Sequence, residues 1–155
     1  IDAGAQIVQL FDTWAGLLSR EQYRHFVLPY HQQIIDQVKQ AHPETPVILY
    51  VNNSRGLLDL MKESGADVIS VDEKTSLSEA RSILGNKMPL QGNLDPLALF
   101  VIPDTLKSMV ASMLLEGGHQ NYIFNLGHGI LPKTPVSNVK LVVDTIKQSS
   151  LSPTH

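Results

Sequence analysis

PVILYVNNSRGLLDLMKESGADVISVD, residues 46–72, holds a complete strand–helix–strand pattern. Its two ends, 46–51 and 67–71, are short apolar runs rich in Val and Ile, which is typical of strands buried on both faces. Between them, residues 55–63 carry leucines at helical spacing, and this segment stops at Gly65. Two strands joined by a helix pair in parallel, so the stretch predicts a βαβ unit.

The same pattern extends in both directions, because short β-prone runs alternate with helical segments along the chain. Five such runs are present, at 6–11, 46–51, 67–71, 88–91 and 122–126. Their order predicts an α/β fold of parallel βα repeats. Five parallel strands form either a small open sheet or the second part of a (β/α)8 barrel of about 250 residues, and periodicity alone leaves both possibilities open.

Capping residues, glycines and prolines mark where helices start and stop. Ser19 and Gln22 form a capping-box pair before a long helix that Pro29 is expected to kink. Another helix is predicted over 77–84, ending at Gly85. Further helices are expected to begin at Pro96, Pro103 and Pro135. Asp95 and Thr134, which precede the first and the last of these prolines, are N-cap candidates.

The composition excludes several classes of function. The 155 residues are 43% hydrophobic and 17% charged, as in an ordinary globular protein. Twelve basic against fifteen acidic side chains give a formal charge of −3, which argues against nucleic acid as a partner. The sequence has no cysteine, which excludes disulfides and Cys-ligated metals. Its apolar runs are shorter than the roughly 20 residues of a membrane span, so no membrane partner is expected.

The loops that follow the strands of a parallel α/β fold carry its functional groups. His128 is the leading candidate, because it follows the last predicted strand and its neighbours Gly127 and Gly129 leave the imidazole accessible to a ligand. The remaining histidines are expected to be structural or to lie on the surface: His25, His31, His42, His119 and His155.

Other polar residues follow the remaining strands. Asp12, Asp72 and Asp95 suit acid–base catalysis if two of them converge, and Asp95 equally suits a helix cap. Thr13 offers its hydroxyl either to a ligand or to its own turn. Arg55 suits an anion at the start of a helix. No phosphate-binding loop, dinucleotide motif or metal-ligand spacing is found in the sequence, so no metal site is expected.

Four motifs together resemble the uroporphyrinogen decarboxylase family of haem biosynthesis. They are AGAQIVQLFDTWAG (3–16), SGADVISVD (64–72), LQGNLDP (90–96) and YIFNLGHGILPKTP (122–135). The resemblance implies a (β/α)8 TIM barrel of which this chain is the C-terminal part, a fragment, with one barrel domain over 1–148 and a polar tail over 149–155. It also implies a carboxy-lyase that removes the four acetate carboxyl groups of uroporphyrinogen III to give coproporphyrinogen III.

The same resemblance implies site residues and partners. His128 matches a catalytic, substrate-contacting histidine at a strand end, Thr13 matches a substrate-binding pocket serine, and Phe11 matches an apolar residue that lines the cleft. The family acts without metal or organic cofactor, as a homodimer, with the substrate pyrrole as electron sink. Its other Asp, Arg and Tyr groups lie in an N-terminal half, so this chain alone is expected to be inactive. The implied location is the cytoplasm, or a plastid in a photosynthetic eukaryote.

Two loops depart from that family pattern, and two alternatives stay open. Residues 51–54 replace a Gly-containing turn, and Glu73 stands where an aromatic residue often follows the Asp that matches Asp72. The first alternative is a corrinoid- or thiol-linked methyltransferase barrel, which resembles this one but holds zinc through His and Cys, so the absence of cysteine counts against it. The second is a non-catalytic interaction half-barrel. An Arg-rich loop and an Asp in the N-terminal half would distinguish the enzyme from it.

Overall fold

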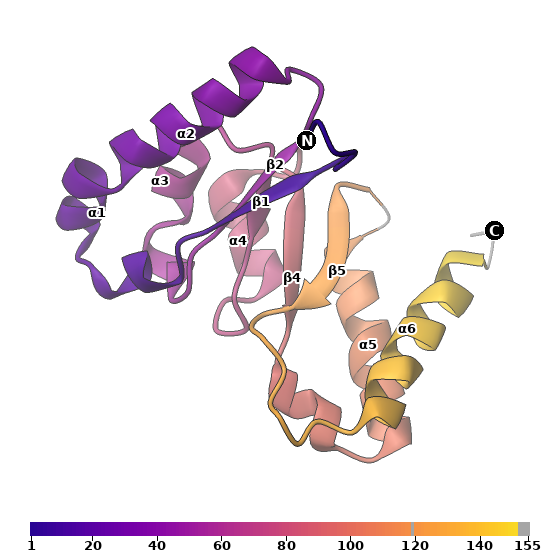
Figure 1. Ribbon diagram of the computed structural model, residues 1–155. Coiled ribbons are helices and arrows are strands. Elements are labelled where there is room, and N and C mark those ends of the chain that lie inside the picture. Colours follow the sequence, from indigo (N-terminus) through magenta and orange to yellow (C-terminus); the bar gives the residue numbers. More distant parts are fainter. Residues whose placement is uncertain (119, 152–155) are drawn as a thin grey trace.

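A parallel sheet of five strands forms the centre of the computed structural model, which describes residues 1–118 and 120–151 (Figure 1). The strands are β1 Val8–Phe11, β2 Val47–Tyr50, β3 Val68–Ser70, β4 Leu90–Leu94 and β5 Tyr122–Leu126. They lie side by side in chain order. Right-handed crossovers repeated in one direction place every connecting helix on the same face, as in a barrel and unlike a doubly wound sheet. The predicted α/β fold of parallel βα repeats is confirmed.

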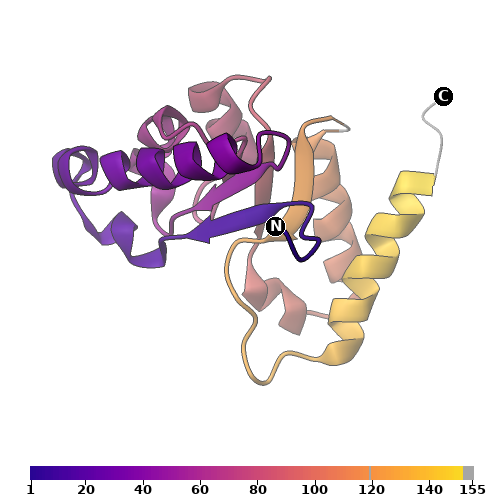
Figure 2. The ribbon, with the colours of Figure 1, turned by 45° about the horizontal axis from the view of Figure 1, so that its top comes forward.

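Helices cover the outer side of this sheet, which curls so that β1 lies across from β5 (Figure 2). The α-helices are α1 Arg20–Phe26, α2 Leu28–Ala41, α3 Leu58–Glu63, α4 Leu77–Leu84, α5 Pro103–Gly117 and α6 Val136–Leu151. Three short 3-10 helices follow strands, η1 Thr13–Leu17, η2 Ser54–Gly56 and η3 Pro96–Phe100.

The main apolar core lies between the sheet and the helices. Leu49, Ile69 and Leu90 are paired in register across three strands, and all are fully buried. They belong to one cluster with Leu58 and Met61 of α3. Burying each such side chain contributes about 1.5–3 kcal/mol. A smaller cluster joins the end of β4 to α5 and α6.

The alternate residues of the same strands line the opposite, concave face. One row crosses all five strands in register: Phe11, Tyr50, Ser70, Gln91 and Ile123. Within it, Gln91 Nε2 donates to Ser70 Oγ at 3.0 Å and to Gln9 Oε1 of β1 at 3.2 Å. A slip of one strand by one residue would turn its core residues to the concave face and bring residues such as Ser70 or Gln91 into the apolar core, so the pairing is strongly specified.

Two elements differ from the sequence prediction in position. The strand expected at 88–91 is β4, which runs further along the chain because the backbone of Asn93 and Leu94 still pairs with β5. Asn93 looks like a turn residue, but its side chain faces inward and donates to the Asp72 carbonyl at 2.6 Å. The helix expected at 55–63 is divided into η2 and α3, with Leu57 between them.

The helix boundaries follow the predicted signals with one break. Ser19 and Gln22 form the capping box, and the helix over 77–84 ends at Gly85 as predicted. The expected kink at Pro29 is wrong, because the helix is interrupted at Val27 and Pro29 lies in the first turn of α2. A proline costs little there, since the first N–H groups of a helix have no partner within it.

The three predicted starts at proline behave differently. Pro103 begins a long α-helix, whereas Pro96 begins only the short η3, which Asp95 caps by accepting from Leu97 N at 2.8 Å. The Thr134 hydroxyl accepts from Leu131 N at 3.1 Å, before α6 begins. Because α6 reaches Leu151, residues 149–151 of the expected tail are helical, and 152–155 lie outside the described residues. The division into a barrel part and a tail otherwise stays a prediction.

Candidate functional site

A cavity of about 270 Å³ lies at the carboxyl ends of the strands, on the concave face of the sheet. It brings together Phe11, Thr13 and His128, which are far apart in the sequence. The rest of its lining comes from β1, β2 and β3 and from the end of β5 with the loop that follows it, namely Gln9, Tyr50, Ser70, Asn125, Leu126, Gly127 and Gly129. Ligands of barrel folds bind at this end of the sheet, so we take this cavity as the candidate site.

Phe11 and Thr13 stand on the β1 side of the cavity. Phe11 is the last residue of β1, and its ring is 66% exposed, with its centroid 5.8 Å from that of Tyr50. Thr13 opens η1 and is half-buried. Within residues 1–118 and 120–151, no hydrogen bond of the Thr13 hydroxyl to another residue is found, which leaves it available to a ligand.

His128 stands across the cavity, on the loop after β5. Its side chain is exposed, whereas the preceding Gly127 is buried. The Gly127 amide donates to the Leu94 carbonyl at 2.8 Å, and a Cβ on Gly127 would lie 2.3 Å from Glu73 N. The close approach of the Glu73 backbone therefore requires glycine at 127, and the turn presents His128 to the cavity.

Tyr50 is a lining residue that sequence reasoning missed. Its hydroxyl donates to the Gly127 carbonyl at 2.9 Å and so joins β2 to the loop that carries His128. Burial, together with the Asp72 and Glu73 carboxylates, raises the pKa of Tyr50 to about 12, so the phenol stays a donor at neutral pH. In the sequence Tyr50 is one residue of an apolar strand, and the only signal that could have found it is its alternate position, which places it on the inward face.

The three strand-end carboxylates do not converge in the cavity. Asp72 is fully buried and accepts from the backbone amides of Ser54 and Lys74, both at 3.1 Å. Asp95 caps η3, and Asp12 faces the helix layer. The condition for paired acid–base catalysis, that two of these carboxylates converge, is therefore not met, because each carboxylate is held by separate partners.

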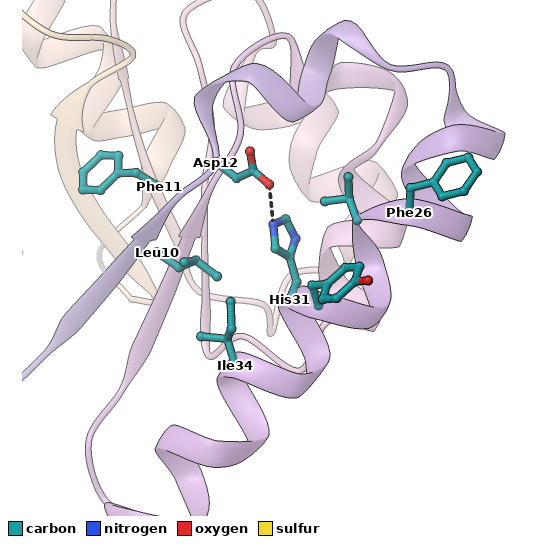
Figure 3. A pocket seen from close by; sticks show the side chains of 8 residues that line it. Leu10, Phe11, Asp12, Phe26, His31 and Ile34 are labelled. Atoms are coloured by element: carbon teal, nitrogen blue, oxygen red, sulfur yellow. Dashed lines mark hydrogen bonds and ion pairs between the residues drawn. The ribbon is translucent and has the colours of Figure 1, made fainter.

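Asp12 is joined to His31 and Tyr23 in a polar chain between β1, α1 and α2, and Figure 3 shows the Asp12–His31 pair from close by. His31 Nε2 lies 2.9 Å from Asp12 Oδ2, and His31 Nδ1 lies 3.0 Å from the Tyr23 hydroxyl. Burial, and secondarily the Asp12 carboxylate, raises the pKa of Tyr23 above its ordinary value. His31 was expected to be structural or exposed, and it is structural; His119 and His155 lie outside the described residues.

Positive charge is scarce around the site. Arg55 pairs with Glu79 at 2.7 Å, and among residues 1–118 and 120–151 neither Lys nor Arg lines the cavity. Asn53 in the same loop has a left-handed backbone, φ 55°, which Asn tolerates better than most residues and which suits a turn otherwise made with Gly. In the described part of the chain no three His, Asp or Glu side chains cluster as metal ligands. That part also contains no helix long and apolar enough to cross a membrane.

A curled parallel sheet with helices outside and a cavity at the carboxyl ends of its strands defines a βα-barrel protein. The family model described as uroporphyrinogen decarboxylase (URO-D) matches residues 1–149. The chain belongs to the uroporphyrinogen decarboxylase family. The resemblance stated from the four sequence motifs is thereby confirmed.

Curated relatives agree with this assignment. The chain is 51% identical over 153 residues to a uroporphyrinogen decarboxylase of Gloeobacter violaceus, covering 99% of this chain and 44% of the relative. It is 49% identical to that of Crocosphaera subtropica, covering 96% and 42%. The chain thus spans less than half the length of these relatives.

A solved structure gives the same picture of the fold. A methyltransferase from Methanosarcina mazei superposes with a TM-score of 0.80 at 25% sequence identity, covering 96% of this chain and 44% of that one. The two chains share their arrangement of strands and helices.

Proposed function

We propose that the full-length protein is a uroporphyrinogen decarboxylase and that the cavity beside His128 binds its substrate. The observation that carries the proposal is that Phe11, Thr13 and His128 line one cavity. Phe11 and Thr13 come from β1 and the helical turn after it, whereas His128 comes from the loop after β5. These are the three positions at which the family resemblance places substrate contacts. Their placement on a strand end, a helical turn and a glycine-flanked loop leaves all three accessible.

The reaction replaces a carboxyl group by a proton. The substrate pyrrole is first protonated; the C–C bond to the carboxylate then breaks, carbon dioxide leaves, and the electron pair moves into the protonated ring. A proton adds to the resulting exocyclic methylene carbon to form the methyl group, and the ring releases its own added proton, so one proton is taken up in total. In this proposal His128 donates to a substrate carboxylate or to the pyrrole side, Thr13 donates its hydroxyl, and Phe11 covers the apolar macrocycle. A charge-assisted hydrogen bond of this kind contributes about 1.5–3 kcal/mol.

Charge matching requires more than this cavity supplies. The substrate carries eight carboxylates, whereas the described part of the chain lines the cavity with the His128 imidazole and with neither Lys nor Arg. We therefore propose that the cationic groups come from parts of the protein outside residues 1–155, within the same barrel. Homodimer formation, catalysis without a cofactor, a cytoplasmic location and the C-terminal placement of this chain within the barrel stay predictions.

The test is decarboxylation of uroporphyrinogen III by the full-length polypeptide, with products separated by their number of carboxyl groups. We expect coproporphyrinogen III from the full-length protein and no appreciable turnover from residues 1–155 alone. Thr13→Val should lower kcat/KM about tenfold and Thr13→Ser should restore most of it, because serine keeps the hydroxyl. An intact, folded full-length protein without decarboxylase activity would contradict the proposal.

A methyltransferase is the second candidate, because one solved neighbour carries that name. The identity to it is 25%, against 51% to the decarboxylase relative. The sequence also lacks cysteine, which the zinc site implied for thiol-linked members would use. Methyl transfer to a thiol in the presence of zinc, without decarboxylation, would favour this candidate instead.

A further inference from the structure

We propose that Tyr50 is a positioning residue for His128, holding the loop after β5 in the conformation that presents the imidazole to the substrate. This inference rests on the proposed function, because it assigns how His128 is held in that site. The structural basis is the hydrogen bond from the Tyr50 hydroxyl to the Gly127 carbonyl, at 2.9 Å.

This hydrogen bond crosses the concave face of the sheet. Tyr50 ends β2 and Gly127 follows β5, so the phenol reaches past β3 and β4. The Tyr50 side chain is buried, and so is Gly127. A bond shielded from water between elements so distant in sequence fixes their separation more firmly than an exposed contact does.

The peptide groups around Gly127 are held from two directions. The Gly127 amide donates to the Leu94 carbonyl of β4 at 2.8 Å, while its carbonyl accepts from Tyr50. The Glu73 backbone closes the third side, since a Cβ on Gly127 would lie 2.3 Å from Glu73 N. The Gly127 carbonyl and the His128 amide belong to one planar peptide group, so the orientation of this group sets the position of the His128 Cα and the direction of its side chain.

Tyr50 also contacts the opposite wall of the cavity. Its ring lies 5.8 Å from that of Phe11, at an interplanar angle of 59°. The Tyr50 side chain therefore contacts both Phe11 on β1 and the loop after β5 that carries His128. Loss of the hydroxyl alone removes the hydrogen bond to Gly127 and keeps the ring contact with Phe11.

Tyr122 offers a matched control. Its hydroxyl also donates to a glycine carbonyl, that of Gly92, and its side chain is half-buried. It does not line the cavity and packs with the apolar core outside the sheet. Tyr122→Phe therefore removes a similar hydrogen bond without touching the histidine loop.

The experiment compares Tyr50→Phe, Tyr122→Phe and His128→Asn in the full-length polypeptide, with uroporphyrinogen III as substrate. Tyr50→Phe should lower kcat/KM about three- to tenfold and change the NMR chemical shifts of the His128 ring, as expected for one lost neutral hydrogen bond. Tyr122→Phe should leave kcat/KM within twofold and the His128 signals unchanged. Equal effects of the two Phe variants on the His128 signals, or none from Tyr50→Phe, would overturn the proposal.

Two further readouts keep the outcomes distinct. If His128→Asn retains full activity while Tyr50→Phe still shifts the His128 signals, the proposed substrate contact fails and the positioning role stands. In the unaltered protein, the Tyr50 hydroxyl proton should exchange slowly and show a nuclear Overhauser contact to Gly127. A fast-exchanging hydroxyl without that contact would overturn the positioning role without relying on any variant.

Discussion

His31 Nε2 lies 2.9 Å from Asp12 Oδ2, and this pair anchors the end of β1 to the outer helix layer (Figure 3). Because an ionised carboxylate only accepts, the Nε2–H of His31 is the donor to Asp12. In the neutral ring, Nδ1 then accepts from the Tyr23 hydroxyl at 3.0 Å. The His31 side chain is 3% exposed, whereas the Asp12 side chain is 37% exposed. Replacing His31 therefore leaves buried polar groups without a partner, whereas replacing Asp12 alters a partly solvated group.

Replacing His31 should therefore destabilise the protein more than replacing Asp12. His31→Leu leaves the Tyr23 hydroxyl buried without its partner, and we expect a loss of about 2–3 kcal/mol in the free energy of unfolding. Asp12→Asn keeps an oxygen near Nε2 and should cost less than about 1 kcal/mol. Urea unfolding measures both. The control is His25→Leu on the exposed face of α1, and an equal cost at positions 25 and 31 would contradict this prediction.

The stability of the protein should fall at alkaline pH. Burial raises the pKa of Tyr23, Tyr50 and Tyr122, that of Tyr50 to about 12. In the unfolded chain these phenols ionise near pH 10, so above that pH the unfolded state binds fewer protons than the folded state and is favoured. Stability should be unaffected by these groups below about pH 9 and should decline from about pH 10 to pH 12, by up to ~1.4 kcal/mol per pH unit for each tyrosine. Unfolding curves between pH 8 and 11.5 test this, and Tyr50→Phe should flatten the decline.

Adding one methyl group at Gly127 should disturb the site, whereas the same change at Gly129 should not. A Cβ on Gly127 would lie 2.3 Å from Glu73 N, while nothing lies within 4 Å of a Cβ on Gly129. Because the obstacle at 127 is backbone, Gly127→Ala must move the loop, and we expect a cost of about 2 kcal/mol or more together with lost activity. Gly129→Ala should keep the melting temperature within about a degree. Similar melting temperatures for the two variants would show that the loop adapts freely.

His128→Asn should impair turnover without impairing folding. The imidazole is exposed and lines the cavity, so its replacement removes a ligand contact and few packing contacts. We expect kcat/KM for uroporphyrinogen III to fall about ten- to a hundredfold, as for one charge-assisted hydrogen bond, with the melting temperature unchanged. A His128 variant with a lowered melting temperature and full specific activity would instead indicate a structural role.

The sequence predicted the strands and most helix boundaries well, because these depend on the local pattern of apolar, capping and turn residues. Five apolar runs, the Ser19–Gln22 capping box and the helix ending at Gly85 correspond to elements of the structure. One error arose where a residue has a distant partner. Asn93, with its turn-like composition, extends β4 because its side chain reaches the Asp72 carbonyl.

By itself, the sequence determined the α/β class and pointed to Thr13 and His128, because strand periodicity and strand-end position are properties of short segments. Phe11 was implied by the resemblance of the sequence motifs to the family. Only the tertiary structure decided which side chains meet. It joined the Tyr50 hydroxyl to the Gly127 carbonyl, turned Asp12 toward His31 and placed Asp72 on the backbone amide of Ser54. Hydrogen bonds between residues 18 to 77 positions apart depend on how the sheet curls and on which face each side chain points to, and that geometry is set by packing of the whole sheet against its helices.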